Sequence, residues 1–188
     1  DSTTASAVHN FQSQMLADDG VVRRRLADGV PVGFFDKRLR ADKRLYLQFL
    51  RMLHERNLLG LARQRRGKAT PFFVEKKGGK QRLVLDCRQP NIFFRHAPRM
   101  ELGAAESLSA IEVPPGRELY LASADVQACF YQYGIDEDLA EWFCLPSISS
   151  ADANEMGLLY FDGTWSIADD DTLVFPAMKV LPMGFAWA

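Results

Sequence analysis

The sequence has only three cysteines, Cys87, Cys129 and Cys144, and they are widely separated. Their odd number and their spacing fit neither a disulfide framework nor a metal site, so we expect reduced core thiols. No stretch reaches the ~18 consecutive apolar residues of a membrane-spanning helix, and no signal-peptide pattern opens the chain. These absences predict an intracellular protein, cytoplasmic or nuclear, with no membrane partner.

Internal repeats and low-complexity tracts are also lacking. The chain instead has 47% hydrophobic residues and 13 phenylalanines in 188 residues, which predicts a packed core rather than disorder. The length suits one compact domain or part of a larger one. The chain opens at Asp1 and stops in an apolar segment, so we expect a fragment with two arbitrary ends.

Basic residues are scarce in the second half of the chain. Residues 100–188 carry two Lys/Arg against 15 acids, whereas residues 37–99 carry 18 against four, although the net charge is only −1. A basic half of this kind favours a polyanionic partner such as nucleic acid. The alternative is that these cations only solvate exposed faces.

Helix signals are concentrated early and strand signals later, which predicts an α+β fold. Residues 42–59 have the period of an amphipathic helix, with Leu45, Phe49, Met52 and Leu53 on its apolar face and Gly60 as its cap. Weaker patterns predict short helices at 11–16, 21–26 and 104–111, with turns at the Asp-Gly pairs 19–20 and 28–29. Strands are expected at 71–77, 81–87, 142–148, 158–161, 164–167 and 172–181, and around Asp125 after a break at 114–116.

Two glycines between the strands at 71–77 and 81–87 predict a β-hairpin with Lys76, Lys77, Lys80 and Arg82 around its turn. Lys80 and Arg82 are two residues apart and share one face of a strand, where they could meet one triphosphate. The alternative is a solvated hairpin with ordinary surface lysines.

Asp125 lies in an apolar stretch, LASADVQACFYQYGI, where a carboxylate is unfavourable in a strand. A carboxylate at the end of an apolar strand is a ligand for Mg²⁺. The alternative is an aspartate satisfied by backbone N–H groups. Asp86 and Arg88 are interpreted as a structural pair.

Four stretches together resemble a reverse transcriptase, the RNA-directed DNA polymerase of retrotransposons and other retroelements. PFFVEKKGGKQRLVLDCRQPN resembles the fingers hairpin, SADVQACFYQYGI the first palm strand, WFCLPSI a further fingers strand, and KVLPMGFAWA the segment before the palm helix. They occur in the order of the family over residues 70–188.

The resemblance implies an α+β right-hand polymerase fold after an N-terminal segment, 1–36, of unknown role. Residues 37–188 would form a partial domain, with fingers at about 37–95 and 138–183 and palm at about 96–137 and 184–188. The palm would contain an antiparallel sheet and would be truncated before the aromatic-x-Asp-Asp turn of the family. The fragment alone is therefore expected to be inactive.

The resemblance also implies roles for individual residues. Asp125 would bind both catalytic Mg²⁺ ions, and the Val126 carbonyl one of them. Lys76 or Lys77, with Arg82, would hold the triphosphate of a dNTP, Phe130 would exclude a 2′-hydroxyl, and Met183 and Gly184 would border the nucleotide. The partners would be dNTP and an RNA or DNA template with its primer. Two alternatives are a catalytically inactive relic that binds nucleic acid and an unrelated α+β protein with a basic face.

Overall fold

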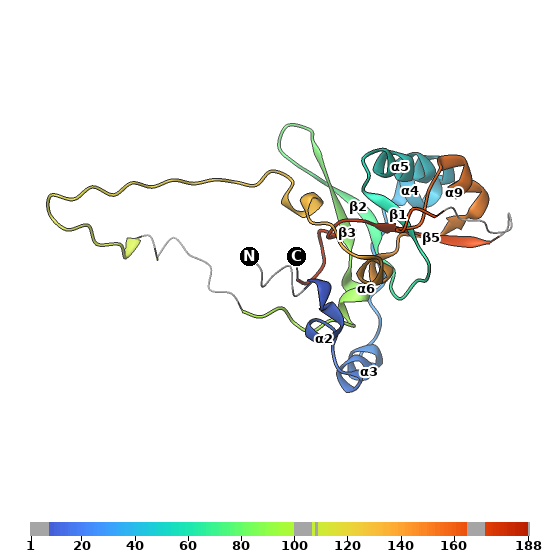
Figure 1. The fold of residues 1–188 in the computed structure, drawn as a ribbon, viewed down its shortest axis with the longest axis horizontal. Helices are drawn as coiled ribbons and strands as arrows, with labels where there is room; N and C mark the ends of the chain where they lie inside the picture. Colours follow the sequence, from blue (N-terminus) through green and yellow to red (C-terminus); the bar gives the residue numbers. More distant parts are fainter. Residues whose placement is uncertain (1–7, 100–106, 108, 165–171, 188) are drawn as a thin grey trace.

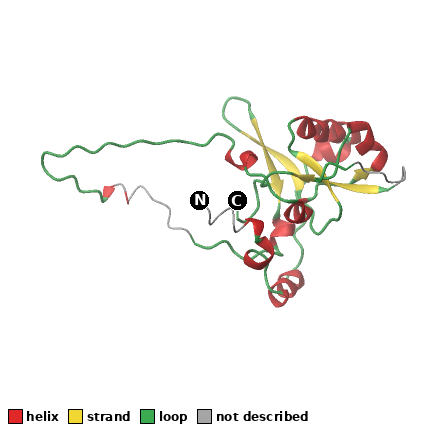
Figure 2. Ribbon diagram, viewed as in Figure 1, coloured by secondary structure: helices red, strands yellow, loops and turns green. Residues whose placement is uncertain are grey.

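The computed structural model describes residues 8–99, 107, 109–164 and 172–187. These residues form helices packed against antiparallel strands, with a long extended segment projecting from the body (Figure 1; Figure 2). The predicted α+β class is confirmed. Among the described residues, no helix combines the length and the apolar character needed to cross a bilayer.

Two small antiparallel sheets form the centre of the body. In one, β5 (Leu173–Met178) lies between β1 (Leu59–Ala62) and β4 (Ile148–Ser149). The other is the hairpin of β2 (Thr70–Glu75) and β3 (Gln81–Asp86), so this predicted hairpin is confirmed. β1 is buried along its whole length, because β5 pairs with one of its edges and Leu159 bonds the other.

Helices surround these sheets (Figure 1). Some of them begin at capping side chains: Asp42 accepts from the N–H groups of Arg44 and Leu45, and Ser149 forms a capping box with Asp152. The α-helices are α2 (Phe11–Gln14), α3 (Asp19–Ala27), α4 (Lys37–Ala41), α5 (Lys43–Glu55), α6 (Arg88–Asn91), α8 (Glu137–Ala140) and α9 (Ser150–Met156); η1 (Cys129–Gln132) and η2 (Glu141–Phe143) are 3-10 helices.

The predicted amphipathic helix is present as α5, but its buried face and its end differ from the prediction. Tyr46, Phe49, Leu50 and Leu53 are buried, whereas Met52 is 41% exposed. The helix ends because Asn57 turns into the left-handed region at φ 55°, and Gly60 lies inside β1 rather than capping the helix. The Tyr46 hydroxyl donates to the Pro146 carbonyl at 2.7 Å, and burial raises the pKa of that phenol.

Aromatic rings from the middle of the chain and from its last residues meet in the core. Phe94 and Phe143 stack at 5.8 Å, and the ring of Phe185 meets each of them edge-on at 4.8 Å. Such contacts contribute about 0.5–1.5 kcal/mol beyond the burial of their area. The segment that contains Phe185 is therefore anchored beside α6 and η2.

Several other predicted elements are confirmed, in whole or in part. Helices α2 and α3 fall where short helices were expected, and β5 covers most of the predicted strand at 172–181. The Asp162-Gly163 turn is present. The Tyr160 carbonyl accepts from Gly163 N–H, and Tyr160 N–H donates to the Thr164 carbonyl. Residues 104–106 and 108 of the helix expected at 104–111, and residues 165–167 of the strand expected at 164–167, lie outside the described residues.

Two other predictions are wrong. The Asp-Gly pair at 19–20 begins helix α3 instead of forming a turn, because Asp18 supplies the carbonyl that accepts the first helical bonds. Residues 142–148 are not one strand: η2 occupies the start of that range, and Cys144 makes only isolated bridges, to Lys68 and Ala177.

Gly67 gives a test of this packing. It is buried, and a Cβ atom there would overlap the backbone carbonyl of Trp142, which has no rotamer by which to move away. We expect Gly67→Ala to lower the free energy of unfolding by about 1–3 kcal/mol in chemical denaturation. Gly20→Ala is the matched control: its Cβ would meet nothing within 4 Å in α3, so its stability should stay equal or rise. Equal effects of the two substitutions would contradict the packing.

Candidate functional site

The turn of the β2–β3 hairpin presents basic side chains to solvent. Lys76 N–H donates to the Lys80 carbonyl at 2.7 Å, which continues the strand pairing by one step beyond Glu75 and Gln81. Gly78 and Gly79 close the turn with φ angles of 81° and 72°. Only glycine adopts such angles without strain, so these two residues let the strands reverse direction.

The strand register sorts the hairpin cations by face. Arg82 lies opposite Val74, and side chains alternate along each strand, so Lys76, Lys80 and Arg82 occupy the same face. Lys77 belongs to the turn itself. All four are exposed, and none has an ion pair with another described residue. Of the two lysines left open by the sequence, Lys76 is the one that shares the face of Arg82.

Met183 and Gly184 lie against the base of this hairpin. Leu85 N–H donates to the Met183 carbonyl at 3.0 Å. Gly184 has a φ angle of 123°, and a Cβ atom on it would overlap the Leu85 carbonyl. The Asn91 side chain holds the segment from the other side, donating to the Gly184 carbonyl at 3.0 Å and accepting from Ala186 N–H at 3.1 Å. Two predicted site residues are thus brought to the strand that carries Arg82.

Phe130 lies in η1, which also lies beside β3. The hydroxyl of the neighbouring Tyr131 lies 3.5 Å from the Leu83 carbonyl oxygen, which belongs to β3. Partial burial raises the pKa of the Tyr131 phenol, and the positive charge of Arg82 partly offsets this rise. Beyond η1, residues 133–135 bond residues 179–181 in antiparallel fashion, which aligns the two segments. The Phe130 ring itself is half-buried.

Asp125 and Val126 are placed differently from the prediction. Residues 118–126 form an extended, exposed segment rather than a strand (Figure 1). Within the described part of the chain, no backbone group of this segment has a hydrogen-bonded partner, and a strand exists only where such partners are present. The prediction of a palm strand here is therefore wrong for this chain.

The carboxylate of Asp125 is exposed, and no cluster of three or more His, Cys, Asp or Glu side chains suited to a metal occurs among the described residues. One carboxylate and the Val126 carbonyl do not make a site for two ions that need several oxygen ligands each. The described residues alone thus do not fit a pair of Mg²⁺ ions.

Several basic residues of α5 and of the loop that follows β1 form ion pairs with acidic residues of the same chain. Lys43 and Arg51 pair with Asp152 and Glu155 of α9, at 2.9 and 3.3 Å. Arg63 pairs with Asp162, and Arg66 bonds the buried Glu141 at 2.7 Å. Acidic residues from the second half of the chain therefore neutralise part of the basic half. The cations of the hairpin have no such ion pairs among the described residues.

Asp86 and Arg88 form a pair, as the sequence suggested, and the pair closes the base of the hairpin. The Asp86 carboxylate is buried and accepts from the Arg88 guanidinium at 2.6 Å, from Arg88 N–H at 3.1 Å and from Phe34 N–H at 2.7 Å. Burial disfavours the charged form of the carboxyl group and would raise its pKa. The hydrogen bonds from these donors stabilise the charged form more strongly, so the pKa of Asp86 lies below its ordinary value.

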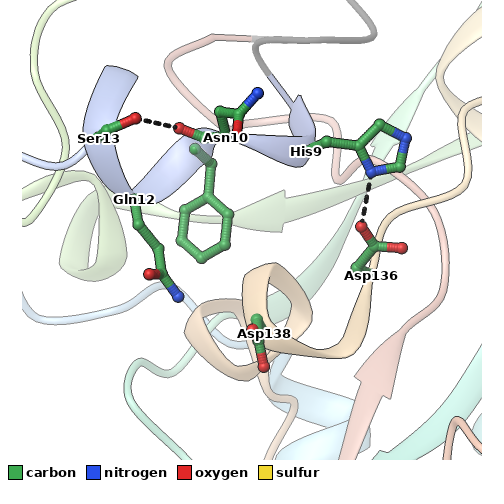
Figure 3. A pocket seen from close by; sticks show the side chains of 7 residues that line it. His9, Asn10, Gln12, Ser13, Asp136 and Asp138 are labelled. Carbon is green, nitrogen blue, oxygen red and sulfur yellow. Dashed lines mark hydrogen bonds and ion pairs between the residues drawn. The ribbon is translucent and has the colours of Figure 1, made fainter.

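A surface hollow of about 320 Å³ lies elsewhere, between α2 and α8. Figure 3 shows the His9 imidazole directed at Asp136, with Nδ1 and the carboxylate 2.9 Å apart. Both side chains are mostly exposed, and none of the predicted site residues lines the hollow. This contact ties the N-terminal helix to α8. Residues 15–17 and 93–95 add backbone bonds, and Arg25 donates to the carbonyls of Ile92 and Phe94.

The structure therefore brings Arg82, Lys76, Met183 and Gly184 to one hairpin, with the Phe130 helix beside it, and leaves Asp125 exposed on the extended segment. Asn91 and Tyr131 complete the arrangement. Asn91 is the last residue of the stretch PFFVEKKGGKQRLVLDCRQPN, and nothing in its sequence context shows that it clamps residues 184–186. The chain matches no protein-family model, and the curated proteins contain no match to it either.

The Asp86 pair gives a pH-dependent prediction. Because the folded pKa is depressed, the charge of Asp86 stabilises the fold above the ordinary carboxyl pKa of about 4 and ceases to do so as pH falls below it. We expect Asp86→Asn to cost about 1–3 kcal/mol in urea unfolding at neutral pH. The gap between wild type and variant should narrow as pH falls from about 6 to about 3. A gap that is constant across this range would show that the charge of Asp86 does not matter.

Proposed function

We propose that the chain is the fingers and partial palm of an RNA-directed DNA polymerase of a retroelement. The observation that carries the proposal is the contact between two motif segments about 100 residues apart in sequence. The Met183 carbonyl bonds β3, and Asn91 clamps Gly184 beside it. This contact assembles the motif that carries the cations and the motif that would border a nucleotide.

The site of this polymerase would bind a dNTP at the hairpin. Lys76 and Arg82, which share a face and lack ion pairs among the described residues, supply the positive charge that a triphosphate requires. Lys77 adds charge from the turn, Met183 and Gly184 border the nucleotide, and Phe130 from η1 limits the space at its sugar.

The complete enzyme would add dNTPs to a primer 3′-hydroxyl on an RNA or DNA template. Two Mg²⁺ ions, when bound, would supply electrostatic stabilisation of the charge that develops on the phosphate oxygens. In this chain Asp125 is the carboxylate assigned to them, and the further carboxylates would come from an aromatic-x-Asp-Asp turn following Ala188. Asp125 would need to move from an exposed segment into a paired strand to join them.

A second candidate function is a catalytically inactive relic that binds nucleic acid. Two observations favour it. Asp125 is exposed and belongs to no metal-suited cluster of His, Cys, Asp or Glu side chains among the described residues, and the cations of the hairpin have no ion pairs there. Both candidates predict binding to nucleic acid, and only the polymerase predicts synthesis.

Charge variants test the binding that both candidates share. We expect the 188-residue chain to bind single-stranded RNA with an affinity that falls as salt rises, because bound cations release counterions from the phosphates. Replacing Lys76, Lys80 and Arg82 together by Gln should reduce the slope of log affinity against log salt by about 2. The matched control replaces Lys37, Arg38 and Arg40 of α4, which are also exposed and without ion pairs among the described residues. If the affinity for RNA does not change with salt, the basic half does not bind the phosphates. If both triple variants reduce the slope of log affinity against log salt by the same amount, the hairpin is not the main binding site.

Primer extension separates the two candidates. In the complete protein, we expect Mg²⁺-dependent extension of a primer on an RNA template, and its loss to background in Asp125→Asn, since the amide removes the charge that attracts the cations. Asp28→Asn, at an exposed aspartate after α3, is the control and should extend normally. Extension by Asp125→Asn near the wild-type rate would reject the catalytic role of Asp125.

A further inference from the structure

The side chain of Phe34 is exposed although its backbone is held at several points. The residue is 55% exposed. Phe34 N–H donates to the buried carboxylate of Asp86 at 2.7 Å, and its carbonyl accepts from the buried Thr70 hydroxyl at 3.1 Å. The backbone of Phe34 is therefore positioned by two buried side chains of the hairpin.

The residues on either side of Phe34 are held to the same hairpin. The Val32 carbonyl accepts from the Arg88 guanidinium at 3.1 Å, and Asp36 N–H donates to the Pro71 carbonyl at 3.0 Å. A segment fixed in this way loses little further entropy when its side chain binds a ligand. Phe34 is thus a pre-organised aromatic surface residue.

The ring of Phe34 continues one face of the hairpin. It meets the Phe72 ring edge-on, with centroids 5.3 Å apart. Phe72 and Val74 are two residues apart in β2, so they share a face, and Arg82 lies opposite Val74 on it. Lys76 and Lys80 follow on the same face. An apolar, aromatic stripe therefore leads into a group of three cations.

The charge of this face is positive and not balanced locally. The carboxylate of Asp86 is already occupied by Arg88, and Glu75 alternates to the opposite face of β2. A ligand that fits must combine flat apolar groups with negative charge. Single-stranded nucleic acid has this combination, since its bases stack on aromatic rings while its phosphates bind Lys and Arg.

We propose that Phe34 is a stacking platform for a base of single-stranded nucleic acid, whose backbone runs toward Lys76, Lys80 and Arg82. The proposal rests on the proposed nucleic-acid function and assigns its single-strand contact to a residue of the N-terminal segment. Phe34 orients the strand on the hairpin and takes no part in chemistry.

The test compares two oligonucleotides of equal length and charge, one with thymine bases and one abasic, by fluorescence anisotropy with the 188-residue chain. Phe34→Ala should weaken binding of the thymine oligonucleotide about 5- to 150-fold, the range of a single base–aromatic stack. Binding of the abasic oligonucleotide and the salt slope should not change, because the cations are untouched. Phe34→Trp should retain binding, whereas Phe34→Leu, apolar but not planar, should behave as Phe34→Ala.

Tyr120→Ala is the matched control, because Tyr120 is an 85% exposed aromatic on the extended segment and should not affect either oligonucleotide. Unfolding midpoints equal to wild type would show that the variants are folded. The proposal is overturned if Phe34→Ala binds thymine and abasic oligonucleotides as the wild type does, or weakens both equally. A wild-type chain that binds neither oligonucleotide at any salt would instead reject the proposed function itself.

Discussion

The buried carboxylate of Asp86 is the interaction on which the arrangement of the hairpin depends. It ends β3, pairs with Arg88 at the start of α6, and accepts from Phe34 N–H. A buried carboxylate is costly unless all its acceptors are used, so three segments converge to satisfy it. Because Asp86 holds them, Phe34 is fixed at the base of the hairpin, while the turn at the other end extends into solvent.

The uneven distribution of charge along the chain has two separate physical roles. Ion pairs from α5 to α9, and from Arg66 to Glu141, join the basic half to the acidic half. In these contacts the charge asymmetry contributes to folding. The cations of the hairpin have no such partners among the described residues, and they are the ones placed beside exposed aromatic and apolar side chains.

How much could be predicted from the sequence depends on how local each element is. The hairpin at 78–79 and helix α5 are specified by neighbouring residues: turn glycines in one, and a capping Asp42 with a 3.6-residue period in the other. The strand around Asp125 had the right composition, yet a strand needs hydrogen-bonding partners from elsewhere. Residues 118–126 have none in the described structure and stay extended.

The sequence by itself determined the α+β class and the hairpin with its four cations, and it supplied the residues from which we propose a nucleotide site. Only the tertiary structure decided which of them meet: Lys76 shares the face of Arg82 through strand register, and Met183 reaches β3 through one backbone bond and the clamp of Asn91. It also decided that Phe34 stays exposed. These are contacts between residues far apart in the chain, and composition and spacing do not encode which partners burial and hydrogen bonding will bring together.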